Sequence, residues 1–296
     1  MSKLSTGLAG LALLVLVGAG CAKSDAPKSP GAAPAKPAAQ APAAAPGKIA
    51  FDFPVQNSLN VSKGNYVLAP SKKAVTDGKT GTYIFYAAKM LAVGAGESQI
   101  ETLAGSQETI PNSLIMRTGF DGAKAAVGDI VLTWWQSGSG MQRAIVTGGT
   151  ATEPEVQYLD LDYSESAKST VILPGSFQKL VGGASGSSLA CKESGEWRHV
   201  QEVKELDGKI LVVGWAGKVS VVPSADCLEV MWENEEIAVG DKVSVPVIGS
   251  YSAATVTKVD KKIGRVWAKY SFAGKESEEA FPIVDVMGKT AAASLK

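Results

Sequence analysis

Side chains able to do acid–base or metal chemistry are scarce in this sequence. The single histidine, His199, lies in a polar stretch, where we expect it on the surface. Asp160 and Asp162 are two residues apart on one expected strand, so their carboxylates share a face and could hold a cation. A solvated strand face is the simpler interpretation of that pair. The glycine-rich residues 182–188 lack the lysine of a phosphate-binding loop and are interpreted as a linker. The sequence therefore predicts no catalytic residues, no metal site and no cofactor.

Two landmarks recur four times along the chain and predict a fourfold internal repeat. The first is a glycine followed three residues later by an aliphatic residue that begins an alternating run, at Gly64, Gly128, Gly186 and Gly240. The second is an apolar residue followed by proline near the end of each unit, at Ile110-Pro111, Leu173-Pro174, Val222-Pro223 and Phe281-Pro282. Because both landmarks keep the same order, we place the repeats at residues 50–118, 119–183, 184–231 and 232–296.

Each repeat is composed of short β-rich runs separated by turns of Gly, Asp and Ser. MQRAIV (141–146) follows the turn SGSG, and YSAATV (251–256) follows the turn IGS. The spacing predicts about five strands per unit, and closing them into a small barrel would remove free strand edges. We therefore expect an all-β protein of four tandem five-stranded barrels, with a short linking helix only at residues 227–236.

The second and fourth units resemble Tudor domains, which are SH3-like barrels. The resemblance lies in VGDIVLTW (127–134), MQRAIV and VQYLDLDYS (156–164), and again in VGDKVSV (239–245), YSAATV and VWAKYSFAG (266–274). Tudor barrels commonly bind ligands through aromatic side chains gathered at one end. The resemblance implies that the ligand-binding aromatics are Trp134, Trp135, Tyr158, Tyr163, Tyr251, Tyr270 and Phe272. The alternative is that many of these rings fill the barrel cores.

The first 20 residues have the layout of a secretory signal peptide. Lys3 precedes an apolar stretch at residues 8–17 that is short for a membrane span, and small residues follow at 18–20. The segment ends at Cys21 and resembles the lipobox of bacterial lipoproteins, in which the cysteine is lipidated and becomes the mature N-terminus. Ala22 after the cysteine implies the outer membrane, on the periplasmic side or at the cell surface. A plain secreted protein is the alternative.

Residues 21–49 predict a disordered tether between the lipid and the folded part. This stretch is nearly all Ala, Pro, Lys and Ser, which supply almost no side chains for a core. Its prolines prevent a continuous helix and favour a semi-extended chain. We therefore expect the folded part to be held away from the membrane surface.

The two resemblances together imply a disulfide. If Cys21 is lipidated, Cys191 and Cys227 remain as a pair in an oxidising compartment. In an SH3-like barrel these positions fall on the neighbouring first and last strands of the third unit. A Cys191–Cys227 bridge is therefore expected, and a pair of buried free cysteines is the alternative.

Function is the least determined property at this level. The 29 basic and 29 acidic side chains balance, so we expect no nucleic-acid partner. The leading interpretation is a lipid-anchored, non-catalytic protein whose tandem barrels bind or organise other envelope components, gaining strength by multivalency. The second is a peptidoglycan-binding or carbohydrate-binding lipoprotein, because residues 58–66 and 195–200 are similar to parts of bacterial SH3 domains. The third is a structural spacer without a ligand.

Overall fold

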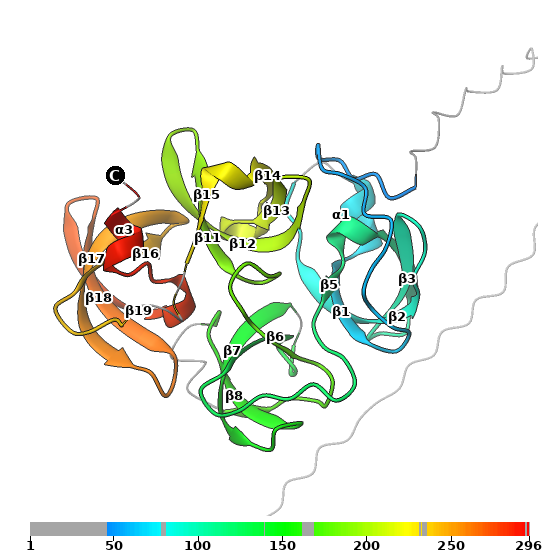
Figure 1. Ribbon diagram of the computed structural model, residues 1–296, viewed down its shortest axis with the longest axis horizontal. Coiled ribbons are helices and arrows are strands. Elements are labelled where there is room, and N and C mark those ends of the chain that lie inside the picture. The colour runs from blue at the N-terminus through cyan, green and yellow to red at the C-terminus, as the bar shows by residue number, and fades with distance from the viewer. Residues whose placement is uncertain are drawn as a thin grey trace, which may run out of the picture. The chain divides into compact units, whose positions relative to one another are not determined.

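The computed structural model describes residues 46–77, 81–138, 140–161, 169–230, 232, 236–293 and 295 (Figure 1). The expected signal peptide, Cys21, Asp162 and Tyr163 lie outside this part of the chain. The segment from Ala44 to Lys296 forms one compact unit. Its described residues are all-β, as predicted, apart from short helical turns such as α1 (Lys72–Asp77) and α3 (Lys289–Ala293). None of the helices among them is long and apolar enough to cross a membrane.

The first two sheets have the same antiparallel topology, in which the last strand returns to pair with the first. The first sheet has the order β4-β3-β2-β1-β5 and the second the order β10-β6-β7-β8-β9. The first contains β1 (Tyr66–Pro70), β2 (Phe85–Ala92), β3 (Glu97–Thr102), β4 (Gln107–Pro111), η1 (Asn112–Leu114) and β5 (Met116–Arg117). The second contains β6 (Ile130–Trp134), β7 (Met141–Gly149), β8 (Pro154–Tyr158), β9 (Thr170–Val171) and β10 (Gln178–Lys179).

The remaining strands repeat this order twice but belong to one nine-stranded sheet, because Arg198 on β12 pairs with Ser250 on β17. The third set is β11 (Ser188–Glu193), β12 (Glu196–Leu206), β13 (Lys209–Val213), η2 (Trp215–Gly217), β14 (Val219–Pro223), η3 (Ser224–Asp226) and β15 (Cys227–Glu229). The fourth is β16 (Lys242–Val247), β17 (Ser250–Asp260), β18 (Arg265–Phe272), β19 (Lys275–Pro282) and η4 (Ile283–Asp285). A bridge between Ser244 and Met287 takes the place of its returning strand.

Both sequence landmarks have a structural cause. The four landmark glycines, Gly64, Gly128, Gly186 and Gly240, have φ values of 87°, 91°, 92° and 94°, a region that favours glycine. Their N–H groups donate to carbonyls of the following second strand, at Met90, Val146, Glu202 and Val256. A β-bulge begins at each of these acceptors. The prolines at 111, 223 and 282 each precede a 3₁₀ turn that leads the chain back toward its first strand.

Cys191 and Cys227 are joined by a disulfide, with their sulfurs 2.04 Å apart. The two residues are direct partners in the β11–β15 register. This pairing also corrects the expectation of a helix beginning at residue 227, because backbone bonds to β11 hold Cys227–Glu229 as a strand.

The expected closed barrels are not found among the described residues. In the described part of the first sheet, β4 and β5 lie on opposite edges and do not pair with each other. The second, third and fourth units each have a small core of their own, but a further core spans the units. The largest hydrophobic core combines side chains from all four, including Leu68, Trp134, Leu211 and Val284. Contact between neighbouring units therefore covers surface that barrel closure would otherwise have to protect.

Candidate functional site

The aromatic residues expected to bind ligand in the second unit are mainly core residues. Trp134 is 1% exposed, and its ring centre lies 4.9 Å from that of Tyr66 on β1. Tyr158 is also buried, and its hydroxyl donates to the Trp134 carbonyl at 3.2 Å and accepts from the Gln136 N–H at 3.0 Å. The structure thus places Trp134 in packing between units and Tyr158 in the core of the second unit, which corrects their assignment as ligand contacts. Trp135, on the opposite face of the strand, is 37% exposed.

The aromatic residues of the fourth unit face different neighbours. Tyr270 is buried against Phe281, with ring centres 5.9 Å apart. The ring of Tyr251 meets His199 edge to face at 5.8 Å. Phe272 is 47% exposed near the end of the β18–β19 hairpin. These three rings do not form the single aromatic site that the Tudor resemblance implies, because two of them are used in packing.

The structure has a different candidate at the junction of the second, third and fourth units. Two adjoining cavities of about 560 and 310 Å³ share the lining residues His199, Gly214, Trp215, Ile248 and Gly249. We call these two cavities together the junction groove. Their volumes fall in the range of small-molecule sites, and they are concave where most of the surface is not.

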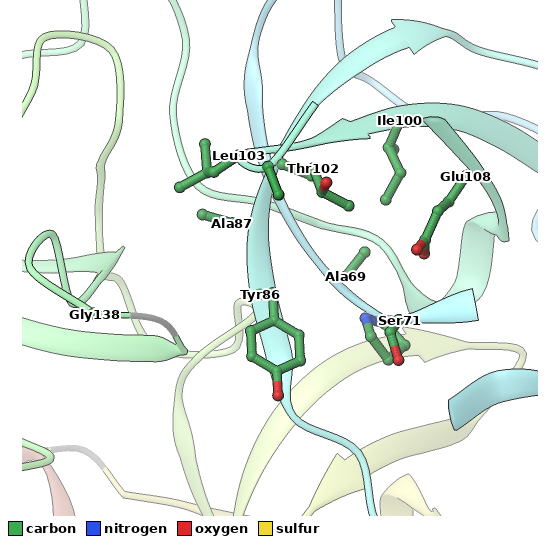
Figure 2. Close-up of a pocket in the computed structure, with 12 residues that line it drawn as sticks. Ala69, Ser71, Tyr86, Ala87, Ile100, Thr102, Leu103, Glu108 and Gly138 are labelled. Carbon is green, nitrogen blue, oxygen red and sulfur yellow. The ribbon is translucent and has the colours of Figure 1, made fainter. Parts of the chain in front are cut away.

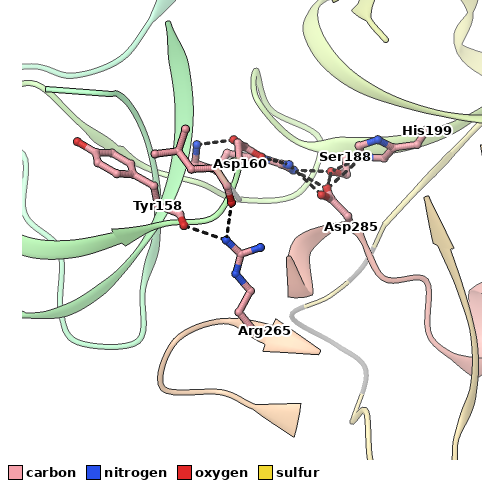
Figure 3. Close-up of polar contacts among 8 residues, drawn as sticks. Tyr158, Asp160, Ser188, His199, Arg265 and Asp285 are labelled. Atoms are coloured by element: carbon pink, nitrogen blue, oxygen red, sulfur yellow. Dashed lines mark hydrogen bonds and ion pairs between the residues drawn. The ribbon is translucent and has the colours of Figure 1, made fainter. Parts of the chain in front are cut away.

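The inner wall of the junction groove is organised by Arg143 on β7, whose side chain is 1% exposed. Its guanidinium donates to Asp285 of the fourth unit at 2.8 and 3.1 Å, and to Asp160 just after β8. It also donates to the hydroxyl of Ser188 on β11. Figure 3 shows these contacts converging from three units on one point. Arg265 lies beside them, and its Nη2 donates to two backbone carbonyls of the second unit.

The guanidinium of Arg143 and the carboxylate of Asp285 both remain charged. Burial alone would lower the pKa of Arg143, but the carboxylates of Asp160 and Asp285 outweigh it and raise that pKa. Burial opposes ionisation of Asp285 as well, yet Arg143 and then His199 hold the pKa of this carboxyl well below its usual range. Two buried carboxylates therefore face one guanidinium in a network whose loss would leave an uncompensated buried charge.

Ser188, His199 and Asp285 have the residue types of a nucleophilic triad, but not its geometry. In such a triad the imidazole lies between hydroxyl and carboxylate and uses a different nitrogen for each. Here the same Nε2 of His199 lies 3.0 Å from Asp285 Oδ1 and 3.3 Å from Ser188 Oγ. Ser188 is buried, and its hydroxyl donates to Asp285 and not to the imidazole. The arrangement fits a hydrogen-bond network that joins the units.

Two sequence expectations about polar residues are corrected by this network. The His199 side chain is only 17% exposed and contacts Asp285, so it is not a free surface histidine. Asp160 accepts from the Arg143 backbone N–H at 2.7 Å as well as from its guanidinium, so it is not a solvated strand residue. Among the described residues, no group of three or more potential ligands could hold a metal ion.

The outer rim of the junction groove is apolar and exposed. Trp215 is 66% exposed and Ile248 is 55% exposed. The indole stem of Trp215 rests on the turn between β16 and β17, where a Cβ added to Gly249 would lie 2.7 Å from that of Trp215. Backbone contacts fix this turn against the third unit, since the His199 N–H donates to the Gly249 carbonyl at 3.0 Å.

Sequence reasoning missed the residues that build this groove. Arg143 has a signal, since it is a lone charge within the otherwise mostly apolar strand MQRAIV. Trp215 stands between two glycines in GWAG, which is the composition of an exposed turn. No local pattern connects Arg143 with Asp285, because they are 142 positions apart and meet only through the packing of units.

A second, smaller cavity of about 240 Å³ lies on the first sheet (Figure 2). Small side chains such as Ala69, Ala87 and Ala88 form its base, and Tyr86 and Leu103 stand at its edge. Its lining is mostly apolar and has no ion-paired wall. The junction groove is therefore the stronger candidate for selective recognition, because selectivity needs a few fixed polar groups.

The scan against protein-family models finds no match, and no curated protein matches the chain significantly. Function is therefore inferred from the geometry of the site itself.

Proposed function

We propose that this protein is a non-catalytic binding module of the bacterial cell envelope. In this proposal Cys21 is lipidated and anchored in the outer membrane, mainly facing the periplasm. Residues 21–49 form the tether, and four SH3-like, Tudor-like units are displayed beyond it. The recurring strand order, landmark glycines and β-bulges support the assignment of four related units.

The observation that carries the proposal is the junction groove, where exposed apolar side chains stand over a fixed polar wall. Trp215 and Ile248 supply apolar contact, and Arg143 with its two carboxylates supplies oriented hydrogen-bonding groups. Because ion pairs and backbone bonds from three units hold the wall, little ordering is required when a ligand arrives. Tryptophan is also the residue type most enriched among binding hot spots.

The expected ligand is another envelope component, either a protein or peptidoglycan. Retention experiments with the purified segment from residue 44, which forms one compact unit, test this. The segment is applied to detergent-solubilised envelope proteins and, separately, to purified sacculi. We expect saturable retention on one of them, weakened about tenfold or more in Trp215→Ala because a central aromatic anchor is lost. Phe272→Ala, an exposed ring of the fourth unit outside the groove, is the matched control and should bind normally.

Retention that is equal in the wild type and Trp215→Ala would contradict the assignment of the groove. Failure to bind either material would favour the structural spacer instead.

The anchor is tested separately with the full chain expressed in a Gram-negative host. Cys21→Ala is expected to abolish incorporation of labelled palmitate and to move the protein out of the membrane fraction, because the remaining chain has no lipid to hold it. The double variant Cys191→Ser and Cys227→Ser, which keeps Cys21 alone of the three cysteines, is the control and should still be labelled. Membrane retention of Cys21→Ala with no labelling would show that the cysteine is not the anchor.

A further inference from the structure

We propose that the junction groove binds an uncharged stretch of a glycan chain, with a sugar ring stacked on Trp215. This inference rests on the proposed binding function and specifies its ligand class. Three features of the groove carry it: the charge balance of its wall, the pairing of donors with acceptors along that wall, and the construction of its rim.

The wall carries balanced charge. Its guanidiniums belong to Arg143 and Arg265, and its carboxylates belong to Asp160 and Asp285. Arg143 is engaged by both carboxylates, so its charge is compensated inside the protein. A site for a phosphate or a free carboxylate would need an excess of positive charge, and a cation site would need the reverse. The larger cavity has neither excess, whereas the smaller one adds Glu193, Arg198 and Lys218, so we expect the neutral polar ligand in the larger cavity.

Donors and acceptors also alternate along the same wall. The Gln201 amide supplies both kinds of group, the Asp160 carboxylate supplies acceptors, and Arg265 supplies donors. A sugar hydroxyl donates one hydrogen bond and accepts others, so neighbouring hydroxyls match a surface on which the two roles lie side by side. These side chains are planar, and Arg265 is oriented by the carbonyls of Tyr158 and Leu161 at 3.0 and 3.1 Å. Orientation before binding reduces the entropy lost on binding.

The rim has the shape of a stacking platform. One face of a pyranose ring presents C–H groups and packs on an aromatic ring, while its hydroxyls point outward. Trp215 is two-thirds exposed, and Gly214 and Gly249 next to it have no side chains that would block approach of a ring. The cavity beneath, at about 560 Å³, leaves room for the adjoining sugar.

The backbone at the rim gives independent support. Ile248 and Gly249 form the two-residue turn between β16 and β17, with φ values of 47° and 77°. Asn-Gly or Gly-Gly normally occupies such a turn, because positive φ is strained for a β-branched residue. The Ile248 side chain is 55% exposed, so its burial does little to offset the strain of the positive φ. Strained positions of this kind cluster at ligand-binding sites. A contact with bound ligand explains why isoleucine stands there.

The groove holds a glycan without cleaving it. Glycosidases need two carboxyl groups of which one remains protonated to act as the acid. Arg143 binds both Asp160 and Asp285. Burial raises the pKa of Asp285, but the Arg143 guanidinium outweighs burial and keeps that pKa low. Asp285 therefore does not serve as a protonated donor, and both oxygens of Asp160 already accept hydrogen bonds from Arg143, so this wall is suited to recognition.

The test is calorimetric titration of the segment from residue 44 with the N-acetylglucosamine tetramer. A soluble muropeptide, in which N-acetylglucosamine is joined to N-acetylmuramic acid bearing an acidic peptide, provides the second titrant. We expect saturable binding of the neutral tetramer. Its affinity should fall by about tenfold or more in Trp215→Ala and stay unchanged in Phe272→Ala. The recovered tetramer should be intact by chromatography.

Ile248→Asn separates a binding role from a folding role. Asparagine tolerates the turn, so the melting temperature should stay the same or rise, while affinity for the tetramer should fall several-fold. A purely structural residue would not give this combination. The glycan inference is overturned if the wild type shows no saturable binding of either titrant, or if Trp215→Ala binds as well as the wild type. Trp215-dependent capture of an envelope protein without sugar binding would refute the glycan class and leave the binding function standing.

Discussion

Two buried cations hold units of this protein together, and their surroundings have opposite effects on them. Arg143 joins the second, third and fourth units and is met by the carboxylates of Asp160 and Asp285. Lys204 joins the third unit to the first, and its ammonium donates to neutral oxygens of Gln56, Asn112 and Ile115. Burial acts against the charge in both places. Coulombic attraction raises the pKa of Arg143, whereas burial lowers the pKa of Lys204 to about 8.

These different surroundings explain why the junction at Arg143 can form a binding wall and the junction at Lys204 only a structural link. A compensated guanidinium keeps its charge and orientation at every physiological pH, so the hydrogen-bonding surface beside it is permanent. A lysine held by carbonyls can lose its proton when solvent is excluded. The three predictions that follow test this difference.

Asp285→Asn should have the largest effect. It leaves Arg143 with one carboxylate and breaks the link to the fourth unit, so we expect the free energy of unfolding to fall by about 3–5 kcal/mol. Denaturant titration measures this loss. Asp226 ends the corresponding 3₁₀ turn of the third unit and is exposed, which makes Asp226→Asn a matched control expected to change stability very little. Equal effects of the two substitutions would show that the Arg143 network does not stabilise the junction.

Lys204→Met should have a smaller effect that depends on pH. The wild-type lysine has a pKa of about 8 when folded and its ordinary pKa of 10.5 when unfolded, so the unfolded chain binds more protons between these values. The stability of the wild type should therefore rise with pH across that interval. Lys204→Met should remove this rise and cost about 1–3 kcal/mol near pH 7, because three acceptors lose their donor.

Lys209 is the control for Lys204. It pairs with the exposed carboxylate of Asp52 at 2.8 Å, so Lys209→Met should leave the pH profile above 8 unchanged. Thermal unfolding at a series of pH values between 7 and 10.5 distinguishes the two variants. If the stability of Lys204→Met still rises fully with pH, another group is responsible for that rise.

Glu202→Gln should have the smallest effect and extends the comparison to a buried anion. Burial, and then Glu205 and Glu229, raise the pKa of Glu202 from its ordinary value of 4.5 to about 7. The folded protein binds more protons between these values, so its stability should fall as pH rises from about 4.5 to 7. Glu202→Gln should flatten that decline and raise stability modestly at pH 7.5. Glu196→Gln, on the exposed start of the same strand, should leave the decline intact.

Much of the fold could be predicted because its signals are local. The landmark glycines mark places where the backbone needs positive φ, and the apolar–proline pairs mark the ends of meanders. Turn chemistry and alternation of this kind act over a few residues, so they are visible in a single sequence. The pairing of Cys191 with Cys227 followed from placing both on neighbouring strands of one repeat.

The candidate site could not be predicted in the same way. The Tudor resemblance directed attention to Trp134, which is buried against Tyr66 of the first unit, and to Tyr158, which is buried in the core of its own unit. The resemblance describes an isolated barrel, in which the face of Trp134 would be open to solvent. Trp215 and Ile248 were overlooked because exposure and backbone strain are properties of the assembled turn between units.

The sequence alone determined an all-β chain and the positions of the landmark glycine turns. Those features depend on side-chain alternation and on glycine and proline geometry, which each segment carries within itself. Only the tertiary structure decided that the third and fourth strand sets share a sheet, that one hydrophobic core spans the units, and that a groove opens at the junction. These depend on contacts such as Arg143 with Asp285, where charge and shape match between segments far apart in the chain. No local pattern records such a match, because it forms only when both segments are already folded.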